Sequence, residues 1–212
     1  MKTRDRIVEG ARLLFNEQGY GAVTTAALAA HLGMAEGNLW YHFKTKRALL
    51  EVLGERFAAA IDYRLDMRPG TDPLASYVDL LRAMMAEFRR FRFLYRDQAG
   101  YGEHADVVGQ RAPEWLQRTF IQLEANLAAL VDAGLLDWPR QRLRDLAINA
   151  TIILRYGLEH YRELGEPTGE GSGTVRRTLR RHLTLFEHAL TGDAAARLHS
   201  AIDAIEDAAL AA

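Results

Sequence analysis

The sequence predicts an all-α fold, and three observations lead to that class. Apolar residues recur every three or four positions through most of the 212 residues, which is the period of an amphipathic helix. No stretch alternates apolar and polar residues with the period of two that marks a half-buried strand. Proline, glycine and capping residues stand at the ends of the periodic stretches. We therefore expect a three-helix N-terminal head of the helix-turn-helix type over residues 1–47, joined by a connector helix to a larger helical bundle within residues 48–212.

The expected head contains three short helices. Thr3 is suited to cap the first one, and Thr24 and Thr25 to cap the second. Gly33 can take the left-handed conformation that ends the second helix and permits a tight turn. Thr45 caps the connector helix, which follows the third. The apolar residues expected to form the small core between the three helices are Ile7, Val8, Ala11, Leu14, Phe15, Leu28, Leu32, Leu39 and Phe43.

The expected bundle is marked out by helix breakers. The connector helix runs from Lys46 to about Met67 and is ended by Pro69 and Gly70. A glycine-rich loop over residues 165–173 carries too little side-chain surface to pack as a helix. The other helices are expected to begin at Asp72 and Pro73, at Pro113, at Pro139, at residue 174 (running to 191) and at Asp193.

The third helix of the head has an unusual distribution of side chains. With about 100° of turn per residue, Leu39 and Phe43 stack on one face. Such an apolar back and a polar front suit a helix that lies in a groove rather than in a protein core. The front is formed by Gly37, Asn38 and Tyr41, flanked by Trp40 and His42.

Charge points in the same direction. Residues 1–47 contain seven Lys and Arg against four Asp and Glu, a net charge of +3, whereas the whole chain carries −1. Such a basic end is expected where one part of a protein meets DNA. Lys46 and Arg47 also occupy the first turn of the connector helix, where the helix dipole favours anions rather than cations. An external phosphate bound at this helix start, with the lysine closing over it, would remove that conflict.

Residues 3–55, with the turn at Gly33 and the run Leu39-Trp40-Tyr41-His42-Phe43 followed by Lys46, resemble the helix-turn-helix of the tetracycline-repressor (TetR) family. The resemblance implies a DNA-binding domain over 1–47 and an effector-binding and dimerisation domain over 48–212. The residue after the threonine pair, a base-reading Arg in the family's founding member, is Ala26 here, so the operator sequence cannot be carried over. The resemblance implies backbone contacts from Thr24, Thr25, Trp40, His42 and Lys46, and base contacts from Gly37, Asn38 and Tyr41.

The bundle offers candidates for two further sites. Polar residues on or beside apolar faces need partners, which a small ligand can supply. Because the resembled family binds an effector in this domain, we expect an apolar or aromatic effector and a pocket formed by Met84, Phe88, Tyr95, Trp115, Phe120, Asn126, Asn149 and Tyr156. The family's last long helices form a homodimer, which implies an interface over Ile153, Gly157, Leu179, Leu183, Phe186 and Leu190; burial of these helices within one chain is the alternative.

Other classes of protein are disfavoured. Without cysteine there is no thiolate catalysis or Cys-based zinc site, and no Glu-x-x-His pair, phosphate-binding glycine loop or nucleophile elbow is present. We therefore expect no enzyme and no cofactor or metal. No apolar run approaches the ~18 residues of a membrane span, so we expect a cytoplasmic protein without a membrane partner. The expected function is a ligand-responsive transcriptional regulator, a repressor that binds a double-stranded DNA operator and is released from it by the effector. The alternative is a small-molecule-binding helical scaffold that no longer reads DNA.

Overall fold

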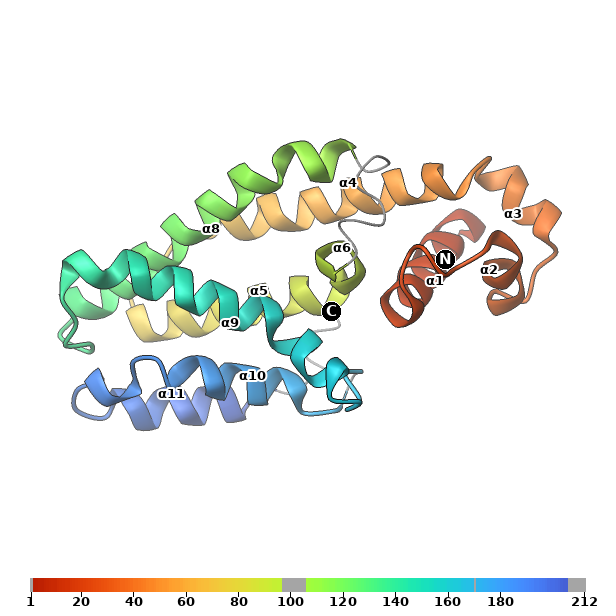
Figure 1. The fold of residues 1–212 in the computed structure, drawn as a ribbon. Coiled ribbons are helices and arrows are strands. Elements are labelled where there is room, and N and C mark those ends of the chain that lie inside the picture. Colours follow the sequence, from red (N-terminus) through yellow and green to blue (C-terminus); the bar gives the residue numbers. More distant parts are fainter. Residues whose placement is uncertain (1, 97–105, 170, 206–212) are drawn as a thin grey trace. The chain divides into compact units, whose positions relative to one another are not determined.

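The computed structural model describes residues 2–96, 106–169 and 171–205, and this part of the chain is all-α, as predicted (Figure 1). None of its helices is both long and apolar enough to cross a membrane. The chain divides into two compact units, which are described separately. The head unit comprises Met1–Asp62 and Arg90–Pro113, and the body unit comprises Tyr63–Arg89 and Glu114–Ala212.

The head unit is built around α1 (Thr3–Gln18), α2 (Thr25–His31), α3 (Glu36–His42) and the first part of α4 (Lys46–Leu65). It also contains α6 (Arg92–Arg96) and the beginning of α8 (Asp106–Asp132). Nearly all of the predicted apolar residues are buried; Leu32 is half-exposed but lies over Gly10, where a Cβ would meet its Cδ2 at 2.3 Å. The connector helix predicted from Lys46 therefore exists, and it continues into the body unit.

The predicted helix ends of the head are mostly confirmed. Thr24 Oγ1 accepts from Ala27 N–H at 3.1 Å and Thr45 Oγ1 accepts from Ala48 N–H at 3.0 Å. Gly33 has φ +62°, a conformation in which a Cβ would be strained. The capping role of Thr3 is wrong, because helical hydrogen bonding already begins at the Lys2 carbonyl and makes Thr3 the first helical residue.

The end of α1 is tied to the short break between two later helices of the chain. Asn16, which is buried, donates through Nδ2 to the carbonyl of Arg90, the last residue of α5 (Pro73–Arg90), at 2.9 Å. Its Oδ1 accepts from the N–H of Phe93 in α6 at 3.0 Å. One carboxamide therefore bonds to both sides of the break between α5 and α6.

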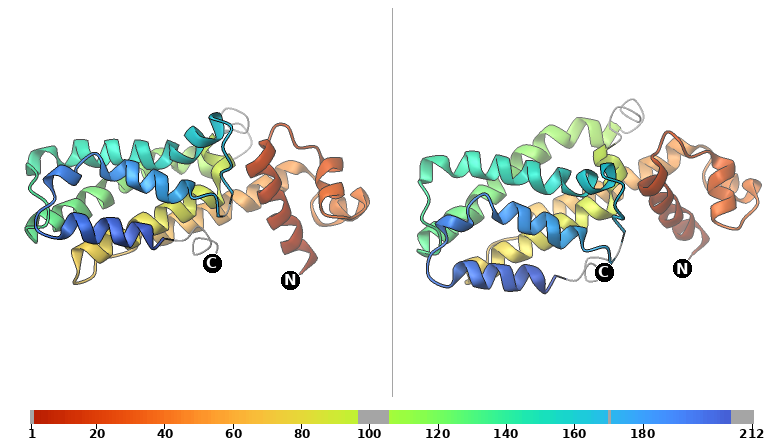
Figure 2. Two further views of the ribbon diagram at one scale, coloured as in Figure 1. Left: turned by 90° about the horizontal axis from the view of Figure 1, so that it is seen from below. Right: turned by 60° about the horizontal axis from the view of Figure 1, so that its bottom comes forward.

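The body unit contains most of α5 and α8, a 3₁₀ turn at Arg140–Arg142, α9 (Leu143–Glu163), α10 (Thr174–Leu183), a second 3₁₀ turn at Glu187–Ala189 and α11 (Ala194–Asp203). Figures 1 and 2 show α9, α10 and α11 side by side. Helices α9 and α10 approach closely at Gly157, where a Cβ would lie 2.2 Å from Thr178 Cγ2. The predicted cap of α5 is confirmed, since Asp72 Oδ1 accepts from the N–H groups of Leu74 and Ala75.

Two predicted boundaries in the body are wrong. Pro113 does not open a helix but lies inside α8, where its missing N–H removes one bond of the helical ladder. Helix α10 ends at Leu183 rather than at 191. The segment after α10 forms backbone hydrogen bonds with the loop that follows α8. Asp137 N–H donates to Ala189 O at 2.8 Å, and Thr191 N–H donates to Leu135 O at 3.1 Å.

Two clusters of polar side chains are buried in the body unit. The guanidinium of Arg64, near the end of α4, donates to Glu87 at 2.8 Å and to Thr119 and Gln122 at 2.9 Å each. In the second cluster, Tyr77 OH and His182 Nε2 lie 2.5 Å apart with both side chains fully buried. Burial raises the pKa of Tyr77 and lowers the pKa of His182 to about 3, so both groups are neutral at pH 7.

Candidate nucleic-acid interface

Helix α3 presents the predicted polar front to solvent. Its back is anchored by Leu39 and Phe43, which are buried. On the opposite side Gly37 and Asn38 are exposed, and the Tyr41 side chain is 78% exposed. A Cβ on Gly37 would meet nothing within 4 Å, so packing does not require glycine there. Absence of a side chain at this position leaves the helix backbone accessible to a partner's surface.

The flanks of α3 and the start of α2 complete this surface. Trp40 and His42 are half-buried, and the His42 ring packs edge-on against Tyr41 at 5.2 Å. Thr25 Oγ1 donates to Glu36 Oε1 at 2.7 Å and so links α2 to α3. Thr24 uses its oxygen as the cap of α2, which leaves its own O–H available to donate to a phosphate.

Lys46 has a role that the sequence did not reveal. Its ammonium donates to the carbonyls of Tyr20 at 2.6 Å and Val23 at 2.8 Å, and it lies 4.2 Å from the centre of the Tyr20 ring. Desolvation by burial lowers the pKa of Lys46. The lysine thus fixes the segment just before Thr24 against the start of α4. A phosphate contact from its third N–H stays a prediction.

Lys44 is a further candidate for a DNA contact, beyond the residues predicted from the sequence. It lies two residues beyond the end of α3, is exposed, and makes no ion pair within the described residues. The neighbouring Arg47, by contrast, pairs with Glu51 at 3.2 Å. An exposed cation beside a polar helix front is the usual source of phosphate contacts. The number of Lys and Arg residues in the sequence does not tell which of these two cations is already paired within the chain.

Of the residues predicted to form an effector pocket, Asn126 alone lines the two pockets described below. Met84, Phe88 and Trp115 are buried in apolar cores, while Phe120 is half-buried with the Arg144 guanidinium 5.3 Å from its ring. Tyr95 belongs to the head unit and packs edge-on against Phe57. Asn149 is exposed on α9, and so is half of Tyr156, which donates to Glu163. A role of these two residues in an effector pocket stays a prediction.

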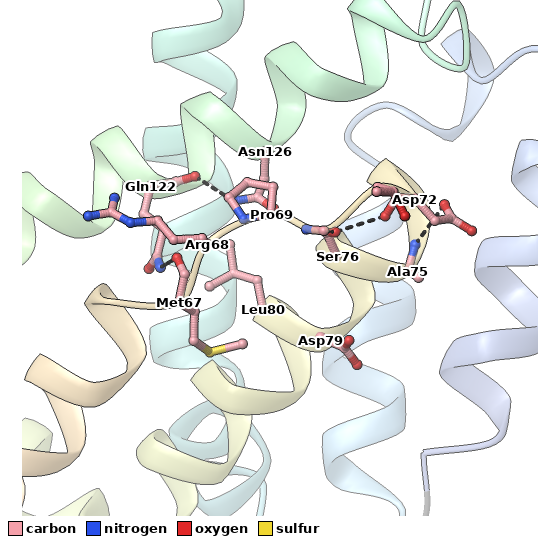
Figure 3. Close-up of a pocket in the computed structure, with 12 residues that line it drawn as sticks. Met67, Arg68, Pro69, Asp72, Ala75, Ser76, Asp79, Leu80, Gln122 and Asn126 are labelled. Carbon is pink, nitrogen blue, oxygen red and sulfur yellow. Dashed lines mark hydrogen bonds between the residues drawn. The ribbon is translucent and has the colours of Figure 1, made fainter.

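Asn126 is the exception. It is buried and lines an open pocket of about 370 Å³ in the body unit, between the segment that connects α4 to α5 and the middle of α8 (Figure 3). An adjoining pocket of about 220 Å³ shares several of its residues. The 370 Å³ pocket is lined by Met67, Arg68, Pro69, Gly70, Thr71, Asp72, Ala75, Ser76, Asp79, Leu80, Gln122 and Asn126.

The predicted dimer residues divide into two groups. Leu179, Leu183 and Phe186 have no exposed surface in a single chain and pack in the core between α10 and its neighbours. Their role at an interface stays a prediction. Ile153, Gly157 and Leu190 are partly exposed, and their role stays a prediction. The large apolar residues that the body exposes on and just after α9 are Ile152 at 59%, Tyr156 at 50% and Leu164 at 61%.

A capped helix, a tight turn and a second helix with an exposed polar front define a helix-turn-helix protein. The profile described as "Bacterial regulatory proteins, tetR family" matches residues 7–53, and the TetR profile described as "Bacterial transcriptional repressor" matches residues 56–198. The chain belongs to the TetR family, whose members are transcriptional regulators and not enzymes. The family expected from the sequence is thereby confirmed.

Individual relatives show how far the similarity extends. The class D tetracycline repressor of Escherichia coli is 38% identical over 99 residues, which cover 45% of this chain and 42% of that protein. The chain thus matches less than half the length of this curated relative. A TetR-family regulator from Marinobacter aquaeolei has a TM-score of 0.77 with 25% identity over 96% of this chain and 98% of that one. A gamma-butyrolactone receptor has the same fold, with a TM-score of 0.61, 17% identity and coverage of 95% and 94%.

Proposed function

We propose that the chain is a homodimeric transcriptional repressor that acts in the cytoplasm, binds a double-stranded DNA operator through α3 and releases it when a small apolar or aromatic effector binds the body unit. The observation that carries the proposal is the exposed front of α3. Gly37, Asn38 and Tyr41 face solvent there while the back of the helix is anchored in the head core. A helix of this form suits the major groove, where an Asn amide can pair with adenine.

The contacts with the DNA backbone are assigned to the flanks of that helix. Thr24 and Thr25 at the start of α2, Trp40 and His42 beside the front, and Lys46 at the start of α4 would hold the phosphates. These contacts would set the register of α3 without reading sequence. Lys44, exposed and unpaired among the described residues, is added to this set.

A second copy of the chain is needed because one head reads few bases. Paired heads bind half-sites about 34–36 Å apart on one face of the duplex. The exposed apolar residues Ile152, Tyr156 and Leu164 support a two-fold interface on α9. Isologous contact of such a surface with its own copy would remove these side chains from water. An Ile152→Asp variant is expected to be monomeric in sedimentation experiments and to lose operator affinity; an unchanged dimer would exclude this interface.

Binding of an effector can weaken operator affinity only if the effector favours one arrangement of the two heads over the other. The name of the gamma-butyrolactone receptor, which shares the fold, and those of the tetracycline repressors support a small ligand. The apolar part of the pocket lining, Met67, Pro69 and Leu80, supports an apolar or aromatic body for that ligand.

The DNA claim is tested by gel shift of fragmented genomic DNA with the full-length protein. We expect selective retardation of a small set of fragments, which survives competition by bulk DNA. The alternative is a small-molecule-binding scaffold that no longer reads DNA. Failure to retard any fragment even at low salt would favour that scaffold over the regulator.

A further inference from the structure

Arg4, in the first turn of α1, carries an exposed cation that the head unit holds next to the end of α3. Its guanidinium carbon lies 4.9 Å from the centre of the Phe43 ring. Phe43 is buried and is the C-cap residue of α3. It stands between His42, the last residue of that helix, and the exposed Lys44. The fold therefore brings a cation from α1 to one end of the helix that is proposed to enter the major groove.

The acidic side chains nearest to Arg4 in the sequence are already paired. Asp5 pairs with Arg56 at 3.0 Å. Glu9 pairs with Arg12, one turn further along α1. Arg4 itself makes no ion pair and no side-chain hydrogen bond with any residue that the structure describes. Its charge is therefore available to an anion from outside the chain.

The contact with Phe43 leaves Arg4 able to bind such an anion. A guanidinium over the face of a ring is attracted by the electrons of that face. It has five N–H donors in a fixed fork, so one ring contact leaves donors for a second partner. Two parallel N–H groups of this fork match the oxygens of a phosphate. The ring also restricts the long arginine side chain before the anion arrives, which lowers the entropy lost on binding.

We propose that Arg4 binds a backbone phosphate of DNA while Phe43 holds its guanidinium in place, so that α1 contributes to the nucleic-acid interface beside the end of α3. The inference rests on the proposed function and extends it to a residue that precedes the helix-turn-helix. Arg4 would act next to Lys44, which is also exposed. Because phosphates carry no sequence information, this contact would position the head on the duplex without preferring any base.

The salt dependence of DNA binding tests the assignment. Arg4→Met removes the cation but keeps an apolar side chain against Phe43. Arg6→Met is the matched control, because Arg6 is also exposed but lies about 200° further around α1. Affinities of the full-length proteins for a random-sequence duplex would be measured by fluorescence anisotropy at about 50–200 mM salt.

The two variants should differ in salt slope. We expect the slope of Arg4→Met to fall by about one for each bound head, so that the ratio of wild-type to variant affinity shrinks about 3.5-fold over this range of salt. Arg6→Met should keep the wild-type slope, and Arg4→Lys, which restores the cation, should restore most of it. An unchanged slope for Arg4→Met, or equal falls for Arg4→Met and Arg6→Met, would overturn the inference.

A measurement on the wild-type protein covers the case in which Arg4→Met does not fold. In ¹⁵N-labelled protein the Nε–H signal of Arg4 should shift when the random-sequence duplex is added at low salt. The corresponding signal of Arg6 should stay in place. A shift at Arg6 but not at Arg4, or at neither residue while the duplex is bound, would exclude the contact.

Failure of this inference and failure of the proposed function give different results. If Arg4→Met retards genomic fragments selectively and keeps the wild-type salt slope, the Arg4 contact is refuted and the regulator is not. If Arg4→Met lowers the slope on the random-sequence duplex but the wild type selects no genomic fragment, the contact is supported and the operator claim is refuted. Wild-type protein that binds neither kind of DNA even at low salt would refute both.

Discussion

The front of α3 in the head unit and the Arg64 cluster in the body unit use polar side chains in opposite ways. Asn38 and Tyr41 are exposed to solvent on the front of α3. Arg64 and Glu87 are almost completely buried, and their charged groups bond to each other and to Thr119 and Gln122. Polar groups that the fold leaves in water are available to a second molecule. Polar groups that it buries in pairs hold helices in register.

The comparison distinguishes residues that bind other molecules from residues that stabilise the fold. The criterion is whether the polar group already has partners within the chain. Removal of an exposed group should change recognition and leave folding intact. Removal of one member of a buried pair should change folding first, because its partner is left as an uncompensated charge. Four experiments test this distinction, and they follow in order of decreasing expected effect.

The largest effect is expected at Arg64. Arg64→Met removes the guanidinium that pairs with the buried Glu87 carboxylate, so the free energy of unfolding should fall by about 3–5 kcal/mol. Urea denaturation followed by circular dichroism measures it. Arg82→Met is the control, because Arg82 pairs with Asp79 at the surface and should cost ~1 kcal/mol or less. Similar losses for the two variants would contradict the distinction.

Acid should destabilise the body through His182. Its pKa is about 3 in the folded chain against ~6.5 when unfolded, so between these values the unfolded state binds a proton that the folded state does not. Stability should therefore fall as pH falls, by about 2 kcal/mol between pH 6.5 and 5. Unfolding curves at several pH values test this. His182→Gln should flatten the dependence and His188→Gln, at an exposed histidine, should not.

Asn38→Ala should alter sequence discrimination without altering stability. If its amide pairs with adenine, preference at one base pair should relax by about 1–3 kcal/mol, whereas unfolding should shift by no more than ~0.5 kcal/mol. Binding to a set of operators with single substitutions measures the first quantity and denaturation the second. Asn149→Ala serves as the exposed control on α9. An unchanged preference would remove Asn38 from the base-reading residues.

Lys46 is expected both to stabilise the fold and to bind DNA. It is half-buried and donates to two carbonyls of the chain, and it lies beside the surface expected to contact DNA. Lys46→Met should lower the free energy of unfolding by ~1 kcal/mol through loss of its bonds to the Tyr20 and Val23 carbonyls. It should weaken all DNA sequences alike, and the salt slope should fall by about one if its third N–H also contacts a phosphate. Lys44→Met should reduce the salt slope and leave stability unchanged. A sequence-selective loss with Lys46→Met would contradict both roles.

The head could be predicted in more detail than the body because its signals are local. A capping threonine, a left-handed glycine and the spacing of Leu39 and Phe43 each act within a few residues. The exposed position of Asn149 and the burial of Leu183 depend on which helices pack against α9 and α10, and apolar spacing does not contain that information. Pro113 misled the prediction because a proline near the start of a helix looks the same in sequence whether it begins the helix or lies within it.

Lys46 escaped prediction for a related reason. Its partners are main-chain carbonyls more than twenty residues away, and a carbonyl has no sequence signature. Asn126 was recognised as a polar residue that needs a partner, but its neighbours in the pocket come from the α4–α5 segment. Only the folded chain brings that segment to α8.

The carboxamide of Asn16 restricts what this position of α1 can accept. The Asn16 side chain donates a hydrogen bond to Arg90 O and accepts one from Phe93 N–H. A carboxylate of the same size would keep the second bond but place an anion against a carbonyl oxygen. A Ser or Thr hydroxyl is too short and has a single oxygen, so it cannot replace the separate donor and acceptor atoms of the carboxamide. Any rotation that separates α6 from the last carbonyl of α5 must break one of the two bonds to Asn16, so the signals of this side-chain amide would report such a rotation.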